Sequence, residues 1–182
     1  MLHCLRNRVN GGHSTFVDGL QAALQLYKTS LEDFLILAST QVNFHYINDG
    51  HHLHCSHPTF ELEKFGSAQS PHVILNGDAY KITSINYSPP FQAPLSVTTS
   101  PAFYNSLAKY AALLDNPNNS FMILLREGDV VVFDNRRVLH GRTAFTDSDQ
   151  NINEDQTNRW LKGCYLEEDP VLDRMRILRA SL

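Results

Sequence analysis

Three stretches of the chain carry apolar residues at the spacing of an α-helix, i, i+3, i+4 and i+7. They lie at 19–28, from Phe34 onward, and at 102–114. A fourth helix is predicted to begin at Asp169-Pro170 near the C-terminus. Each is preceded by residues that favour the start of a helix: Asp18, the capping box of Ser30 with Asp33, the pair Ser100-Pro101, and Asp169-Pro170. The pattern therefore predicts a few separate helices of ordinary length.

Most of the remaining apolar runs are short and rich in β-branched and aromatic residues, which favours strands. We expect strands at 2–9, 14–17, 41–47, 59–65, 72–76, 80–87 and 158–166. The runs 121–125 and 130–133 flank a turn that contains Gly128 and predict a hairpin. Many short strands with few helices indicate a mostly β fold with flanking helices (α+β), a sandwich or a barrel. No repeat or linker divides the chain, so we expect one domain over 1–182.

Composition narrows the class of protein. The net charge of −4 gives no basic field for nucleic acid, and no apolar run reaches the ~18 residues of a membrane helix. The N-terminal residues lack the apolar stretch of a signal peptide. Cys4, Cys55 and Cys164 are an odd and scattered set, which suits free thiols in a reducing compartment. We therefore expect no nucleic-acid partner and no membrane partner.

The segment FDNRRVLHGRTAF (133–145) carries the strongest chemical signal. It places His140 at or near a strand end, and Arg159 follows in the strand-like run 158–165. An imidazole and a guanidinium on adjacent strands suit one task. The imidazole binds a metal, and the guanidinium forms a bidentate pair with the far carboxylate of a ligand that chelates the metal. Two nitrogens and one carboxylate on one face of iron form the facial triad of oxygenases.

Other interpretations of these residues remain open. A lone histidine near a strand end is more often structural, and a lone arginine is more often a surface residue. The cluster HHLHCSHP (51–58) offers His51, His54, Cys55 and His57 as zinc ligands, although its spacings are shorter than those of zinc fingers. Gly11-Gly12 lacks the context of a phosphate loop and is typical of a turn with positive φ.

Four motifs together resemble a known family. The segments LHC (2–4), GGHSTFVDG (11–19), FDNRRVLHGR (133–142) and RMRILR (174–179) are similar, in order, to the γ-butyrobetaine and trimethyllysine dioxygenases of the taurine-dioxygenase-like superfamily. INYSPPFQAP (85–94) and RMRILR resemble the γ-butyrobetaine enzymes more closely.

The resemblance implies a fold and a set of site residues. The fold would be a double-stranded β-helix, or jelly roll, incomplete at the N-terminus. Its iron would bind an H-x-D pair and a distal histidine, which His140 matches. Arg159 matches the arginine that binds the distal carboxylate of 2-oxoglutarate. Leu2 and Ser14 match family positions near the cosubstrate. Tyr165 matches an aromatic wall of the substrate site, and Asn86 matches an asparagine that binds the substrate carboxylate.

The chain departs from the family in two places. It contains no H-x-D or H-x-E, so we expect it to begin after that pair. The polar stretch 147–156 resembles an insertion between His140 and Arg159. The resemblance implies an iron- and 2-oxoglutarate-dependent dioxygenase, assisted by ascorbate, that hydroxylates a trimethylammonium substrate.

Several hypotheses follow from the resemblance and the departures. The lead hypothesis is γ-butyrobetaine hydroxylation to L-carnitine, and the alternatives are a trimethyllysine dioxygenase or a non-catalytic fragment. A homodimer is an expected assembly. The cytoplasm fits the γ-butyrobetaine reaction and the mitochondrion fits the trimethyllysine reaction.

Overall fold

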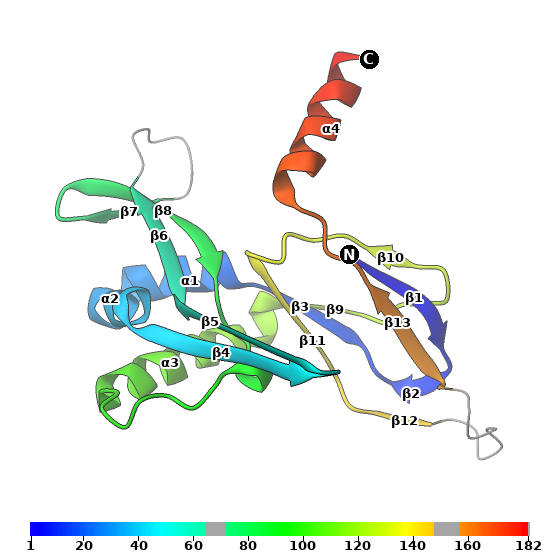
Figure 1. The fold of residues 1–182 in the computed structure, drawn as a ribbon, viewed down its shortest axis with the longest axis horizontal. Helices are drawn as coiled ribbons and strands as arrows, with labels where there is room; N and C mark the ends of the chain where they lie inside the picture. The colour runs from blue at the N-terminus through cyan, green and yellow to red at the C-terminus, as the bar shows by residue number, and fades with distance from the viewer. Residues whose placement is uncertain (65–71, 148–156, 182) are drawn as a thin grey trace. The chain divides into compact units, whose positions relative to one another are not determined.

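The computed structural model describes residues 1–64, 72–147 and 157–181 (Figure 1). Contacts between residues group the chain into two compact units. The first comprises Met1–Ser14, Met122–Phe133 and Arg142–Leu182, and the second comprises Thr15–Phe121 and Asp134–Gly141. A single domain over 1–182 stays a prediction.

The helices of the second unit begin where the sequence predicts. They are α1 (Gly19–Thr29), α2 (Leu31–Ser39) and α3 (Pro101–Leu114), and all three contact one another. The N-cap side chains of Asp18, Ser30 and Ser100 accept hydrogen bonds from backbone N–H groups in the first turns. Because each cap satisfies a donor that has no partner within its helix, these starts are determined locally. Two short 3₁₀ helices, η1 (Pro89–Phe91) and η2 (Pro117–Asn119), lie before and after α3.

Two small antiparallel sheets complete most of the second unit. β4 (Gln41–Asn48) pairs with β5 (His51–Pro58), and β8 (Asp78–Ile85) lies between β6 (Phe60–Lys64) and β7 (His72–Leu75). The segment 51–58 was not among the strands expected from the sequence, yet it forms β5. Asp49 and Gly50 both have positive φ, as a two-residue hairpin turn requires.

The hydrophobic core belongs to the second unit and lies between its helices and sheets. Phe34 stacks on Phe60 with 5.2 Å between ring centroids, and Tyr110 meets Phe60 edge-on at 4.9 Å. All three side chains are fully buried. The Tyr110 hydroxyl donates to the Gly19 carbonyl oxygen at 3.0 Å, so the largest core residue also satisfies its polar atom.

The first unit is built on paired strands with fewer buried side chains. β1 (Leu2–Asn7) lies between β10 (Val130–Val131) and β13 (Arg159–Gly163), and β2 (Val9–Gly11) pairs with β12 (Phe145–Asp147). The helix α4 (Glu168–Ala180) has no buried residue and extends away from β1 and β13 (Figure 1).

The predicted hairpin of 121–125 with 130–133 was wrong, because the two strands pair with different partners. β9 (Ser120–Ile123) lies in a sheet of order β11-β3-β9, with β3 (Ser14–Asp18) in the centre and β11 (Val138–Arg142) on its other side. β10 pairs with β1 instead of β9. The turn explains the difference, because Cys4 on β1 exchanges backbone hydrogen bonds with Gly128 and Asp129 at 2.8 and 2.9 Å.

The mostly β, α+β class is confirmed by these elements. The complete jelly roll and its missing N-terminal part stay predictions. Within the described ranges, no helix is long and apolar enough to cross a membrane.

Candidate functional site

The segment that carries His140 is tied to its surroundings on both sides. Arg136 accepts a backbone hydrogen bond from Ile85 at 2.8 Å, and Arg137 accepts one from Gly19 at 3.0 Å. The Arg137 guanidinium also binds the Asp18 carboxylate through Nε at 3.1 Å. The backbone leading into β11 is therefore anchored to β8 and to the start of α1.

His140 occupies the third position of β11 and is exposed at the surface of the strand. Desolvation of part of its imidazole nevertheless lowers the pKa of this side chain. A neutral imidazole is the form that binds a metal. The next residue, Gly141, lies so close to β3 that a Cβ there would be 3.2 Å from Thr15 Oγ1. The strand thus presents the imidazole from a closely packed backbone.

The predicted pairing of His140 and Arg159 on adjacent strands was wrong. Arg159 begins β13, whose neighbour is β1, whereas His140 lies on β11, whose neighbour is β3. The two residues also belong to different compact units. Strand neighbours depend on long-range pairing, which spacing along the sequence does not determine.

Arg159 lies on β13 opposite Asn7 of β1. Its Nη2 donates to the Gly12 carbonyl oxygen at 3.4 Å. Within the described part of the chain, the buried side-chain atoms without a hydrogen-bond partner are Arg159 Nε and Asn7 Oδ1. A buried donor and a buried acceptor on paired residues, not bonded to each other, are typical of a site that a ligand or water completes.

The guanidinium of Arg159 also lies over the Phe145 ring, at 5.8 Å from its centroid. Burial lowers the pKa of this guanidinium, and the nearby charge of Arg142 lowers it further. Gly12 has a φ of +68°, and a Cβ on it would be 3.1 Å from Arg159 Nε. Glycine at this position therefore provides the space in which the arginine lies.

The two other predicted cosubstrate positions lie on strands of their own. Leu2 begins β1 and is half-buried, opposite Gly163. Since Asn7 faces Arg159, Leu2 lies five residues along the strand from it, or about 16 Å at ~3.3 Å per residue. Ser14 is 3% exposed at the start of β3. Their predicted roles remain hypotheses.

Asn86, predicted to bind a substrate carboxylate, is held by the protein itself. Its amide donates to the Pro58 carbonyl oxygen at 2.9 Å and to Glu61 Oε1 at 3.1 Å, and it accepts from Ser84 at 3.2 Å. A substrate would therefore have to replace one of these hydrogen bonds.

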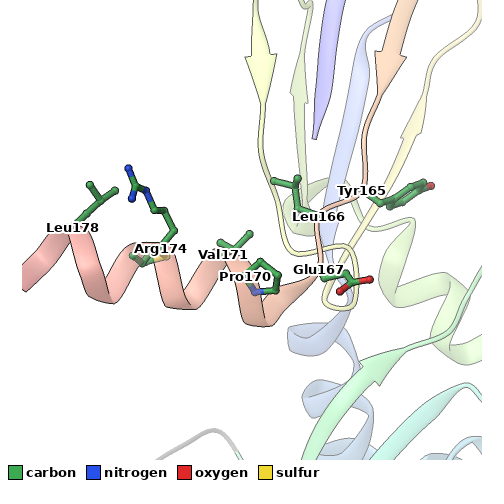
Figure 2. Close-up of a pocket in the computed structure, with 8 residues that line it drawn as sticks. Tyr165, Leu166, Glu167, Pro170, Val171, Arg174 and Leu178 are labelled. Carbon is green, nitrogen blue, oxygen red and sulfur yellow. The ribbon is translucent and has the colours of Figure 1, made fainter.

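Tyr165, predicted as an aromatic wall, is not a core residue, because it is 84% exposed. It lies in the segment between β13 and α4 and borders an open pocket of ≈ 540 Å³ that α4 lines with Val171, Met175 and Leu178 (Figure 2). An exposed ring face can stack on a trimethylammonium group.

The histidine-rich segment is a strand instead of a zinc loop. Alternation along β5 places His54 opposite His45 on one face and Cys55 opposite Phe44 on the other. In the ranges that the structure covers, no three His, Cys, Asp or Glu side chains gather as metal ligands. The zinc hypothesis for these residues was wrong.

Comparison with known proteins places this geometry in a family. Residues 1–165 match the model of the taurine catabolism dioxygenase TauD, TfdA family. The chain belongs to the TauD/TfdA family. A crystal structure from Burkholderia xenovorans, described as a candidate alpha-ketoglutarate-dependent 2,4-D dioxygenase, has a TM-score of 0.50 at 14% identity and covers 88% of this chain and 58% of that chain. It shares the fold of this TauD/TfdA member.

Curated relatives in the TauD/TfdA family extend the comparison. The dioxygenase str8 of Strobilurus tenacellus is 46% identical over 98% of this chain and 39% of its own length. Human gamma-butyrobetaine dioxygenase is 32% identical over 98% of this chain and 43% of its own length. Human mitochondrial trimethyllysine dioxygenase is 29% identical over 98% and 38%. The chain thus spans less than half the length of these relatives.

Two residues beside Arg159 were not predicted from the sequence. Arg142 and Arg159 both lie over the ring of Phe145. The available signal was the pattern R-x-x-F directly after His140, which carries a cation and a ring on the same short segment.

Proposed function

We propose that the protein that contains this chain is an iron- and 2-oxoglutarate-dependent dioxygenase. The observation that carries the proposal is Arg159, whose Nε is buried without a hydrogen-bond partner among the described residues of a TauD/TfdA family member. A guanidinium presents several donors in a planar fork that matches a carboxylate. The distal carboxylate of 2-oxoglutarate would supply the missing acceptor.

The residues of this chain have separate roles in the proposal. Arg159 would bind and orient the cosubstrate. Leu2 and Ser14 are proposed as further cosubstrate positions, although Leu2 lies about 16 Å along β1 from the residue opposite Arg159 and so would not contact the same carboxylate. His140 would supply one neutral nitrogen ligand to iron. Because its pKa is lowered, the imidazole stays unprotonated to lower pH than a free histidine does.

The described residues do not by themselves fit the iron. No group of three ligand side chains is found among them, and the sequence contains no H-x-D pair. When bound, iron supplies the oxidation; it would need ligands besides His140. Once the ligand set is complete, ascorbate would keep the iron reduced.

For the substrate, we infer γ-butyrobetaine, with L-carnitine, succinate and carbon dioxide as products of reaction with 2-oxoglutarate and oxygen. The support is the similarity to gamma-butyrobetaine dioxygenases from Homo sapiens and from Pseudomonas, at 32% and 30% identity. The exposed ring of Tyr165 suits the cationic end of this substrate. Trimethyllysine is the alternative, since its dioxygenases are similar at 29%. The cytoplasm, or the mitochondrion for trimethyllysine, and a homodimer belong to the same proposal.

A second candidate is a chain without catalytic activity. The observation that favours it is the single family ligand, His140, in a sequence without H-x-D. A site with one protein ligand of three holds iron weakly.

Two measurements test these proposals. We expect the gene sequence before Met1 to encode an in-frame H-x-D segment; its absence would contradict the enzyme proposal. The protein with this segment should form succinate from 2-oxoglutarate when γ-butyrobetaine is added, and the 182-residue chain should not. Succinate formed by the 182 residues, but not by their Arg159→Ala variant, would contradict the second candidate. A higher rate of succinate formation with trimethyllysine than with γ-butyrobetaine would identify trimethyllysine as the substrate.

A further inference from the structure

Two arginines of the first unit share one aromatic ring. The guanidinium carbon of Arg142 lies 4.6 Å from the Phe145 ring centroid, and that of Arg159 lies 5.8 Å from it. The electron-rich face of the ring attracts cations, which offsets part of their mutual repulsion. Phe145 therefore stabilises an arrangement that places two positive charges close together.

Strand pairing and backbone hydrogen bonds hold the segment that carries Arg142 and Phe145 in place. Phe145 pairs with Gly11 in the β2–β12 ladder, and Gly12 donates to the Ala144 carbonyl oxygen at 3.0 Å. A few residues away, Thr143 bonds to His13 in both directions, at 2.9 and 3.0 Å. The segment that carries Arg142 and Phe145 is thus held beside the glycine that also contacts Arg159.

Neither arginine has a carboxylate partner within residues 1–64, 72–147 and 157–181. Arg142 donates to the Thr143 carbonyl oxygen at 3.3 Å, and Arg159 donates to that of Gly12 at 3.4 Å. Both contacts are long for hydrogen bonds and involve neutral acceptors. By contrast, Arg8 of the same unit pairs with Glu127 at 3.0 Å. Among the described residues, the two guanidiniums therefore have no anionic partner.

We propose that Arg142, held by Phe145, is a second binding residue for the distal carboxylate of the dicarboxylate cosubstrate. Arg159 accepts the carboxylate in a bidentate manner, and Arg142 adds a second charge-assisted contact. The identity of the ligand rests on the proposed function, whereas the two-arginine site rests on the distances above. A second cation makes the site selective for 2-oxoacids that carry a distal carboxylate.

The test measures binding of three small molecules to the metal-free chain by ligand-observed NMR titration. The ligands are 2-oxoglutarate, succinate, and 2-oxopentanoate, which lacks the distal carboxylate. We expect Arg142→Ala to weaken 2-oxoglutarate binding about tenfold, a difference of ~1.4 kcal/mol. Binding of 2-oxopentanoate should be weak and equal in all variants. The affinity for 2-oxoglutarate should also fall less with added salt in the variant, because one cation is gone.

Matched variants control for charge and folding. Arg126→Ala removes an exposed arginine of the same unit and should bind 2-oxoglutarate as the unaltered chain does. Arg142→Lys keeps the charge and should recover part of the affinity. If Arg142→Ala does not fold, judged by circular dichroism, the Lys variant and Arg142→Gln carry the comparison.

The outcomes separate this inference from the proposed function. If Arg159→Ala abolishes binding but Arg142→Ala does not weaken it, the inference is wrong and the proposed function stands. If both weaken binding, yet the protein with a complete ligand set does not decarboxylate 2-oxoglutarate, the inference stands and the proposed function is wrong. If the unaltered chain binds neither dicarboxylate, the inference is wrong, and the proposed function is then decided by the succinate assay of the longer protein.

Discussion

The two compact units handle buried charge in opposite ways. In the second unit, the buried carboxylate of Asp33 accepts hydrogen bonds from Ser106 at 2.8 Å and Lys109 at 2.5 Å, beside a core of stacked aromatic rings. In the first unit, the Nε of Arg159 is buried without a partner among the described residues. Among the described residues, the buried carboxylate of the second unit therefore has its partners within the protein, whereas one donor of the Arg159 guanidinium in the first unit does not.

The largest expected effect is the loss of an aromatic core side chain in the second unit. Phe60→Ala should lower the free energy of unfolding by about 3–5 kcal/mol, because the ring is fully buried between Phe34 and Tyr110. The exposed Phe121→Ala is the control and should change it by less than ~0.5 kcal/mol. Urea unfolding measures both. Equal losses would show that the core does not hold the stability of the chain.

Removal of the buried carboxylate should have the next largest effect. Asp33→Asn should cost about 1.5–3 kcal/mol near neutral pH, since it removes charge-assisted hydrogen bonds. Hydrogen bonds from Lys109 and Ser30 lower the pKa of Asp33 from 3.8 to about 2. A depressed folded-state pKa contributes stability above the unfolded value near 3.8, and this stability is lost as the pH falls towards 2. The difference between the two proteins should therefore shrink between pH 4 and 2, as measured by unfolding at each pH; a constant difference would contradict the assignment.

Substitution of two glycines distinguishes the cost of backbone strain from an effect on the Arg159 site. Gly12 and Gly77 both have positive φ, and each Gly→Ala variant should cost about 1 kcal/mol or more. A Cβ at Gly77 meets nothing within 4 Å, whereas at Gly12 it approaches Arg159 Nε at 3.1 Å. Only Gly12→Ala should therefore also weaken 2-oxoglutarate binding. Equal affinities in the two variants would show that Gly12 does not shape the site.

The smallest change in stability should come from the site arginine itself. Arg159→Met removes a buried, unsatisfied donor and keeps most of the packing, so the free energy of unfolding should change by no more than ~1 kcal/mol or rise. Binding of 2-oxoglutarate should be lost in the same variant. Thermal unfolding and an NMR titration on one sample measure both. A large loss of stability would mean that Arg159 is a structural residue, as the Asp33 carboxylate is.

Most helix starts and turns could be predicted from the sequence because the interactions that determine them are local. The caps at Asp18, Ser30 and Ser100 bond to N–H groups within three residues. The turn at Asp49-Gly50 is equally local, but the histidine-rich composition of 51–58 does not favour a strand, and β5 forms because it pairs with β4.

By itself, the sequence determined the helix starts, the strand-rich class and the family motif around His140. Only the tertiary structure decided which strands pair, and therefore that β10 joins β1 and that His140 and Arg159 lie in different sheets. It also brought Arg142 and Arg159 to the ring of Phe145, and Arg159 beside Gly12. Strand pairing and side-chain clusters depend on contacts between residues far apart in the chain, and local propensity carries no information about which of those contacts form.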